Sequence, residues 1–298
     1  MGGWNFIDRT NMRFGKLVAQ KYLGNKKWLC HCDCGNDCVV DSDRLPINSK
    51  RRMQKSCGCL LESRLLEEKH FFDIIDTEEK AYILGFAASD GTVSYDTNKS
   101  SYSLKFVVNS VDIQLLEEFR QILKSKVQVK TFETITNLPQ GGTCTSEMSS
   151  VLFCSKTLVE GLIDKGVTPR KSLTLKIDYS KIPDNLKRHF WRGLFDGDGT
   201  FGLFGKKKIL EVSLTTSKIM AETTKKEILE MFPDFKVNFY ERKECSGQTY
   251  NLIFTTQKDG FSFLQYMYED CNIKLARKFE KYKTIKQIIN SNDYPEKE

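Results

Sequence analysis

The chain has 298 residues, of which 40% are hydrophobic and 29% charged, a composition that suits a soluble globular protein with a sizeable core. It contains no run of 18 apolar residues, and its N-terminus, MGGWNFIDRT, lacks an apolar signal region, so neither a membrane span nor a secretory leader is predicted. The formal net charge of +7 modestly favours a polyanionic partner.

The N-terminal unit, predicted as residues 1–60, concentrates six of the ten cysteines: Cys30, Cys32, Cys34, Cys38, Cys57 and Cys59. Because no secretory signal is present, we expect a cytoplasmic protein, and in the reducing cytosol clustered cysteines usually bind metal. The turns CDCG and SCGC each carry a glycine that lets the chain bend, which favours a structural Zn²⁺ on Cys32, Cys34, Cys57 and Cys59. Cys30 and Cys38 are the alternates, and a metal-free cluster is the competing interpretation.

Residues 61–76, LESRLLEEKHFFDIID, are highly charged and predict a helical linker. The sequence after them divides into two similar halves, 77–180 and 181–290, followed by a polar tail, 291–298. The matched residues are Gly85, Asp90, Gly91 and Thr92 in the first half and Gly193, Asp198, Gly199 and Thr200 in the second. Both halves follow the order α-β-β-α-β-β-α, which predicts a duplicated α+β fold with pseudo-two-fold symmetry.

The apolar periodicity places the elements of each half at corresponding positions. In the first half the matched segment 81–93 opens with a helix that ends at Asp90-Gly91, and we expect further helices at 111–125 and 155–166 and strands at 101–110, 126–135 and 149–155. In the second half the matched segment 190–201 contains a helix that ends at Asp198-Gly199, and we expect further helices at 217–232 and 258–271 and strands at 208–217, 235–244 and 248–256. Asp112 and Ser217 are the expected N-caps of the second helix in each half.

The first helix of each half carries small residues four positions apart, Gly85 and Ser89, then Gly193 and Gly197. Glycine within a helix costs about 1 kcal/mol relative to alanine, so a compensating interaction is expected. Small residues on one helix face allow two helix backbones to touch. We therefore predict that these two helices pack against each other along the pseudo-two-fold axis.

Each of these helices ends in Asp-Gly, at Asp90 and Asp198. The helix dipole disfavours a carboxylate at this end, and two neighbouring carboxylates repel unless a cation lies between them. Oxygen ligands favour Mg²⁺, which activates water and stabilises the leaving oxygen in phosphodiester cleavage. The competing interpretation is that Asp-Gly marks only a turn, but two copies at matched positions argue against it.

The segments ILGFAASDG (83–91) and WRGLFDGDG (191–199) resemble the two LAGLIDADG motifs of homing endonucleases, a likeness that extends over roughly residues 77–290. In that family the eighth motif residue is the catalytic acid, which corresponds to Asp90 and Asp198. The first motif departs at its sixth position, where Ala88 replaces the usual Asp that Asp196 supplies in the second.

The resemblance implies a monomeric, site-specific endonuclease that cuts both strands of a long double-stranded DNA site. It also implies two four-stranded sheets that form a saddle over the major groove, two or three Mg²⁺ ions shared by the acids, and short 3′ overhangs. A freestanding enzyme is favoured because no protein-splicing signals occur, and we expect a phage or bacterial host, with an organellar one left open.

A second repeated signature pairs PRKSL (169–173) with ARKFE (276–280). Lys171 follows Asp90 by 81 residues, and Lys278 follows Asp198 by 80. A lysine near the metal could orient water or offset phosphate charge, and the resembled family often has one per active site. The competing interpretation is a basic pair that contacts phosphate or solvent.

Alternating polar residues on the predicted strands suggest base-reading positions, because Lys, Arg, Asn and Gln recognise base edges in the major groove. The DNA-contact candidates are Lys105, Lys126, Gln128, Lys130, Lys236, Asn238, Tyr240, Arg242 and Gln248. A solvated sheet face would have the same pattern.

The N-terminal block WLCHCDCGNDC with SCGCL also resembles a small zinc module found beside phage and bacterial nucleases. Its basic run, which includes Arg51 and Arg52, is expected to contact DNA, whereas a purely structural module is the alternative. For the whole chain, the rival functions are an intron RNA maturase, a non-cutting DNA-binding regulator and a metal-binding structural protein. The retention of both Asp90 and Asp198 argues against the regulator.

Overall fold

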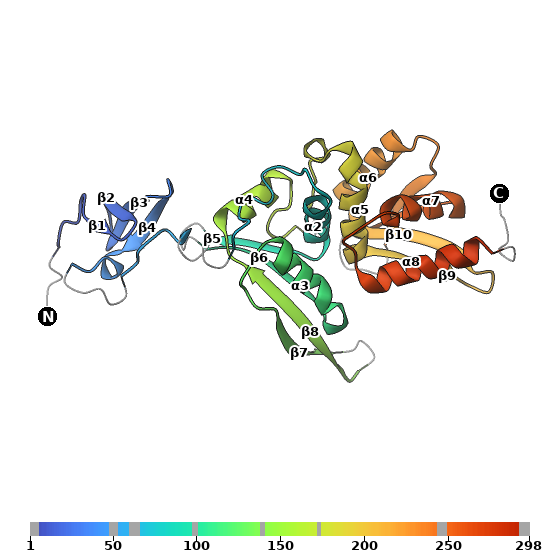
Figure 1. Ribbon diagram of the computed structural model, residues 1–298, viewed down its shortest axis with the longest axis horizontal. Coiled ribbons are helices and arrows are strands. Elements are labelled where there is room, and N and C mark those ends of the chain that lie inside the picture. Colours follow the sequence, from blue (N-terminus) through green and yellow to red (C-terminus); the bar gives the residue numbers. More distant parts are fainter. Residues whose placement is uncertain are drawn as a thin grey trace.

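The computed structural model describes residues 6–47, 53–59, 66–96, 101–137, 141–171, 174–242 and 249–291. Within these ranges the chain forms three four-stranded antiparallel sheets, one in the N-terminal module and one in each repeated half (Figure 1). This arrangement confirms the predicted mixed α+β fold. Among the described helices, none combines the length and the apolar character needed to cross a membrane.

The N-terminal module is a meander of β1 (Arg13–Phe14), β2 (Leu17–Gly24), β3 (Lys27–Cys32) and β4 (Asp37–Asp41), followed by a short 3₁₀ turn. One face of the sheet buries Leu17, Trp28, Val40 and Leu45 together with several cysteines. This apolar cluster is separate from the core of residues 66–289, and the module lies at one end of the molecule in Figure 1.

The segment before the first half corrects the helical-linker prediction, because residues 66–76 form turns with no helix. Phe71, Phe72 and Ile75 are buried in the main core, and Leu66 forms a β-bridge with Ser125. Burial of these apolar side chains against the first half, rather than the charged residues, determines the conformation of this segment.

The first half comprises α2 (Glu78–Ser89), β5 (Thr92–Asp96), β6 (Ser101–Asn109), α3 (Ile113–Ile122), β7 (Lys130–Asn137), β8 (Thr143–Phe153) and α4 (Lys156–Asp164). Its sheet has the strand order β5-β6-β8-β7. Because β7 begins at Lys130, the candidates Lys126 and Gln128 precede the strand on which they were expected. Asp112 makes no capping hydrogen bond, and its carboxylate instead pairs with Arg277.

The second half comprises α5 (Asp184–Asp198), β9 (Gly199–Phe204), β10 (Ile209–Ser217), α6 (Lys218–Met231), β11 (Val237–Glu241), β12 (Thr249–Phe254), α7 (Gln257–Tyr268) and α8 (Ala276–Ile289). Its sheet order is β11-β12-β10-β9. Ser217 caps α6 as predicted, because its hydroxyl accepts a hydrogen bond from the Met220 amide. The terminal helix α8 was not predicted.

Helices α2 and α5 pack side by side at the seam between the halves (Figure 1). A Cβ added to Gly85 would lie 2.0 Å from the Phe190 carbonyl oxygen, and one added to Gly193 would lie 2.1 Å from that of Tyr82. The two glycines therefore permit direct backbone contact, which confirms the predicted helix pairing. This contact offsets the helical cost of glycine.

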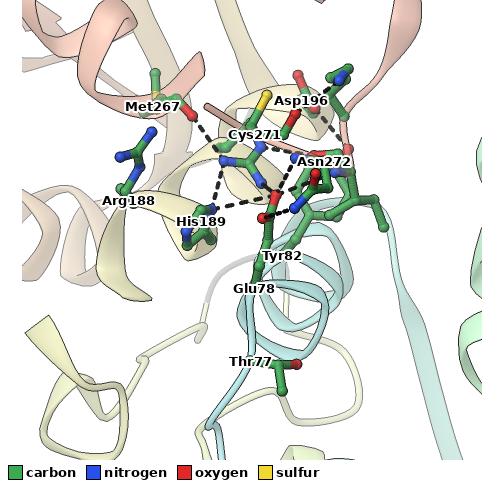
Figure 2. Close-up of polar contacts among 12 residues, drawn as sticks. Thr77, Glu78, Tyr82, Arg188, His189, Asp196, Met267, Cys271 and Asn272 are labelled. Carbon is green, nitrogen blue, oxygen red and sulfur yellow. Dashed lines mark hydrogen bonds and ion pairs between the residues drawn. The ribbon is translucent and has the colours of Figure 1, made fainter. Parts of the chain in front are cut away.

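A buried ion pair connects α2 and α5 where the two halves meet (Figure 2). Arg192 of α5 is fully buried, and its Nη2 donates to the Oε1 of Glu78 in the first turn of α2 at 2.6 Å. Its other nitrogens donate to the carbonyl oxygens of Met267 and Ile273 and to the His189 ring. The Asn272 backbone amide and side-chain amide also donate to Glu78. This network, the Glu78–Arg192 clasp, therefore satisfies both buried charges.

Among the described residues, α3 and α4 contact the first sheet, and α5, α6 and α7 contact the second, whose edge strand β9 also meets α8. Leu104, Phe106 and Val108 of β6 are buried on the helix side, whereas Lys105 and Asn109, at alternate positions, are exposed. The second sheet alternates in the same way along β10. The opposite faces, called the open faces below, are therefore the ones on which the polar candidates lie.

Candidate functional site

The two predicted acids lie where the paired helices end. Asp90 is the C-cap residue of α2, and Asp198 is the last residue of α5. A Cβ added to Gly197 would lie 1.9 Å from the Ser89 hydroxyl and 3.2 Å from Oδ2 of Asp90. The absence of a side chain at Gly197 therefore leaves the space in which the Asp90 carboxylate lies beside the end of α5.

The two carboxyl groups share one electrostatic environment. Although both residues are exposed, burial of the carboxyl raises the pKa of Asp198 to about 6, and repulsion from Asp90 adds to the shift. Burial also raises the pKa of Asp90, against the opposing attraction of Lys278 and Lys171. Simultaneous ionisation of the two carboxyl groups is therefore disfavoured, and a cation bound between them would relieve this repulsion.

The predicted lysines converge on the same helix ends. Lys171 Nζ donates to the Ser89 carbonyl oxygen at 2.6 Å, and Lys278 Nζ donates to the carbonyl oxygens of Phe195 at 2.5 Å and Gly199 at 2.7 Å. Burial lowers the pKa of both amines, that of Lys278 to about 8. Each ammonium group therefore neutralises the carbonyl end of the helix that carries an acid.

The donor chemistry of this centre suits a hard divalent cation. Two carboxylates open to solvent at adjacent helix ends offer oxygen ligands of the kind that Mg²⁺ prefers. The space left by Gly197 beside Asp90 would be filled by any larger side chain. The two lysines supply positive charge near the acids while being held by backbone carbonyls.

A recess of about 530 Å³ adjoins Asp90 and extends along the first sheet past Val107 and Met148. Arg277 lies at its wall, and its Nε donates to Oδ2 of the buried Asp112 at 2.9 Å. No local sequence pattern predicts this ion pair, because the two residues are 165 positions apart.

Asp196, the sixth residue of the second motif, faces away from the paired acids and into the core. Its carboxylate accepts hydrogen bonds from the hydroxyls of Tyr82 at 2.7 Å and Tyr268 at 2.5 Å, and from the Leu275 amide (Figure 2). Ala88, at the corresponding position of the first motif, is buried without any polar group. The departure of the first motif thus leaves the paired acids unchanged.

The polar candidates divide between the open faces and the sheet edges. Lys105 and Lys130 are exposed and lie on the open face of the first sheet, on either side of the β8 residues Ser150 and Leu152. On the second sheet, Tyr240 accepts a hydrogen bond from Asn251, which also accepts one from Thr215. The edge strand β11 carries Asn238, which contacts Lys225, and it is flanked in sequence by Lys236 and Arg242. The candidates Arg51, Arg52 and Gln248 lie outside the described residues.

The cysteine prediction selects the same four side chains that the structure brings together. The Sγ atoms of Cys32, Cys34, Cys57 and Cys59 all lie within 4.8 Å of one another. The separations are 3.7 Å from Cys32 to Cys59 and 3.3 Å from Cys34 to Cys57, against about 3.8 Å for a tetrahedral site with Zn–S bonds of about 2.3 Å.

The backbone around the cluster has the form of two turns. Gly35 and Gly58 both have positive φ, at 89° and 120°, as the predicted metal-binding turns require. The alternates Cys30 and Cys38 lie opposite each other on β3 and β4 and face the apolar core of the module. His31 instead pairs with Asp37.

Comparisons with known proteins bear on the fold. Residues 185–267 match the LAGLIDADG-like domain. The fold is similar to that of the homing endonuclease I-WcaI bound to its DNA recognition sequence, with 13% identity, a TM-score of 0.51, and coverage of 80% of this chain and 94% of that chain. The likeness to I-WcaI shows that the α+β fold is the one expected from the motifs.

Two further structures are similar at lower TM-scores. The I-LtrWI LAGLIDADG homing endonuclease bound to target DNA has 14% identity and a TM-score of 0.44, with coverage of 72% of this chain and 91% of that one. A variant of I-DmoI in complex with its target DNA in the presence of magnesium has 15% identity and a TM-score of 0.43, with coverage of 69% and 99%. No curated protein sequence gives a significant match.

Proposed function

We propose that the protein is a site-specific homing endonuclease that cuts both strands of double-stranded DNA and leaves short 3′ overhangs. The observation that carries the proposal is the convergence of Asp90, Asp198, Lys171 and Lys278 at the ends of α2 and α5, where the two halves meet. A site that cleaves two strands requires two such centres, and the repeat supplies them in matched pairs.

In this proposal each residue has a defined role. Asp90 and Asp198 would hold the divalent ions, two or three Mg²⁺, through their carboxylate oxygens, and Mg²⁺ bound there would supply activation of water and stabilisation of the leaving oxygen. Lys171 and Lys278 neutralise charge beside the scissile phosphates. Lys105, Lys130, Tyr240 and Arg242 contact the DNA from the two open faces.

The test replaces each acid by its neutral isostere. Asp90→Asn and Asp198→Asn should each abolish double-strand cleavage of a site selected from a random DNA library, while affinity in a gel shift stays within a few-fold of the parent. Asp96→Asn, which lies at the far end of β5, is the matched control and should cleave normally. Full double-strand cleavage by either acid variant would contradict the assignment.

RNA maturation on the same fold is the second candidate. Its outcome in the same experiments is distinct: the parent protein would bind structured intron RNA, select no DNA site, and tolerate both substitutions at the acids. The retained acids with their two lysines favour DNA cleavage, because RNA binding alone requires no metal centre at the seam.

For residues 1–60 we propose a structural Zn²⁺ site on Cys32, Cys34, Cys57 and Cys59 in a module that binds DNA beside the main site. Tethering a second weak binder raises affinity through effective concentration without altering the cleavage centre. Deletion of residues 1–60 should shorten the DNA footprint on one side and weaken binding by about 100-fold, with unchanged cut positions. A structural module that packs on the main body would instead lower the melting temperature and leave the footprint unchanged.

A further inference from the structure

The open face of the first sheet carries a contiguous apolar stripe, formed by Phe132, Met148, Val107 and Leu152. Phe132 of β7 lies directly opposite Met148 of β8. Val107 of β6 is diagonal to both Met148 and Leu152, because its direct partner is Ser150. Phe132 and Leu152 remain 37% and 44% exposed, so this part of the molecule leaves the stripe accessible.

The open face of the second sheet has a different arrangement. Its exposed apolar residues among the described positions, Phe204 and Ile209, pair with each other at the hairpin end of β9 and β10, and the half-buried Ile253 of β12 lies apart from them, between Ser213 and Asn238. The row of Glu211 and Gly202 separates them from the centre of the sheet. Tyr240, Asn251 and Thr215 form a hydrogen-bonded chain across that centre. The two open faces therefore present different chemistry to their partner.

Charge identifies the class of partner that the stripe fits. Lys105 lies opposite Leu152, and Lys130 lies opposite Ser150, so both flank the stripe on the same face. Among the described residues of these four strands, the carboxylate on the same face is that of Asp96, at the end of β5. The recess beside Asp90 is lined by Val107 and Met148, so the stripe leads directly to a predicted cleavage centre. A polyanion placed for cleavage at Asp90 must therefore cover these apolar side chains.

Within the major groove, one base offers a matching apolar surface. Thymine alone presents a methyl group there, whereas the other bases present only hydrogen-bond donors and acceptors. We infer that the stripe recognises thymine 5-methyl groups in the half-site that lies over the first sheet. This inference rests on the proposed DNA-binding function and deepens it, because it specifies how one half-site is read.

The test uses the full-length protein and a site selected from a random double-stranded DNA library. The selected site is resynthesised with deoxyuridine in place of thymidine in one half-site at a time, which removes only the methyl groups. Replacement in one half-site should weaken binding about fourfold for each methyl group contacted, and replacement in the other should change affinity less than twofold.

Variants assign the effect to the stripe. The double variant Met148→Gln/Leu152→Gln removes two of the four stripe side chains and should therefore discriminate less than the parent between the thymidine and deoxyuridine sites. Ile209→Gln on the second sheet should keep the parent's discrimination. Both substitutions are on exposed or half-buried side chains, and unchanged thermal melting of each variant checks that it folds.

The outcomes separate this inference from the proposed function. If no DNA site is selected or bound, both are overturned. If a site is bound and cut but deoxyuridine has no effect in either half-site, or the discrimination is undiminished in the double variant, only the inference is overturned. A selected site in which neither half-site contains thymine on either strand would also overturn it. If the double variant loses self-association but binds DNA as the parent does, the stripe contacts a second copy of the chain and the inference is overturned.

Discussion

Breaking the Glu78–Arg192 clasp should destabilise the protein strongly. Arg192→Met removes a fully buried guanidinium and leaves Glu78, whose side chain is 13% exposed, without its permanently charged partner; the amides of Asn272 and Ile273 and the His189 ring at 3.6 Å remain. It also removes the hydrogen bonds that the guanidinium donates to the carbonyl oxygens of Met267 and Ile273. Leaving one charge of a buried pair uncompensated costs about 3–5 kcal/mol, a large fraction of the ~5–15 kcal/mol by which a typical domain is stable.

The assay is urea unfolding at neutral pH of the parent, Arg192→Met, Glu78→Leu/Arg192→Met and the control Lys226→Met. Lys226 forms an exposed helical ion pair with Glu230, so its loss should change the free energy of unfolding by less than about 1 kcal/mol. The double variant should recover most of the stability, because no buried charge remains. A loss below about 1 kcal/mol in Arg192→Met would refute this reasoning, as would a double variant no more stable than the single one.

Three other predictions test the site and its surroundings. Burial, together with Arg192, lowers the pKa of His189 from 6.5 to about 4, so its stabilisation is complete above pH 6.5 and is lost as the pH falls toward 4. Unfolding free energies across this range should fall by up to about 3 kcal/mol, and a flat profile would contradict the buried neutral imidazole. Lys171→Met and Lys278→Met should slow cleavage far more than they weaken binding, whereas equal losses with a shallower salt dependence would indicate phosphate contacts. Replacing Cys57 and Cys59 by Ser should release bound zinc, measured by metal analysis, and reproduce the shortened footprint of the 1–60 deletion; retained zinc would argue for other ligands.

Much of the fold follows from features that are local in sequence. The repeated glycines predicted the contact of α2 with α5, because a Cβ at Gly85 would lie 2.0 Å from the Phe190 carbonyl oxygen, so only glycine allows the two backbones to approach this closely. The helical prediction for residues 66–76 failed for the opposite reason. Charge there indicated a solvent-exposed helix, but Phe71 and Phe72 gain more from burial in a core that the sequence alone does not locate.

In the candidate site, too, some features follow from the sequence and others depend on tertiary packing. The repeat and the small residues of the paired helices placed Asp90 near Asp198, because the ends of two helices that pack about a pseudo-two-fold axis lie close together. The convergence of the four predicted cysteines was equally accessible from the sequence, since the glycine turns CDCG and SCGC place them in pairs. The carbonyl contacts of Lys278 and the pairing of Arg277 with Asp112 depend on tertiary packing, and no sequence spacing reports them.

The Glu78–Arg192 clasp also makes each half specific for the other half rather than for a second copy of itself. The repeat places Leu186 at the position of Glu78 and Leu84 at the position of Arg192. A dimer of two first halves would therefore bury Glu78 against leucine, and a dimer of two second halves would do the same to Arg192. Either assembly would carry two unpaired buried charges, each costly. The duplicated units are thus compatible with each other but no longer with their own copies, so the fused chain cannot revert to a symmetric ancestor without losing this pair.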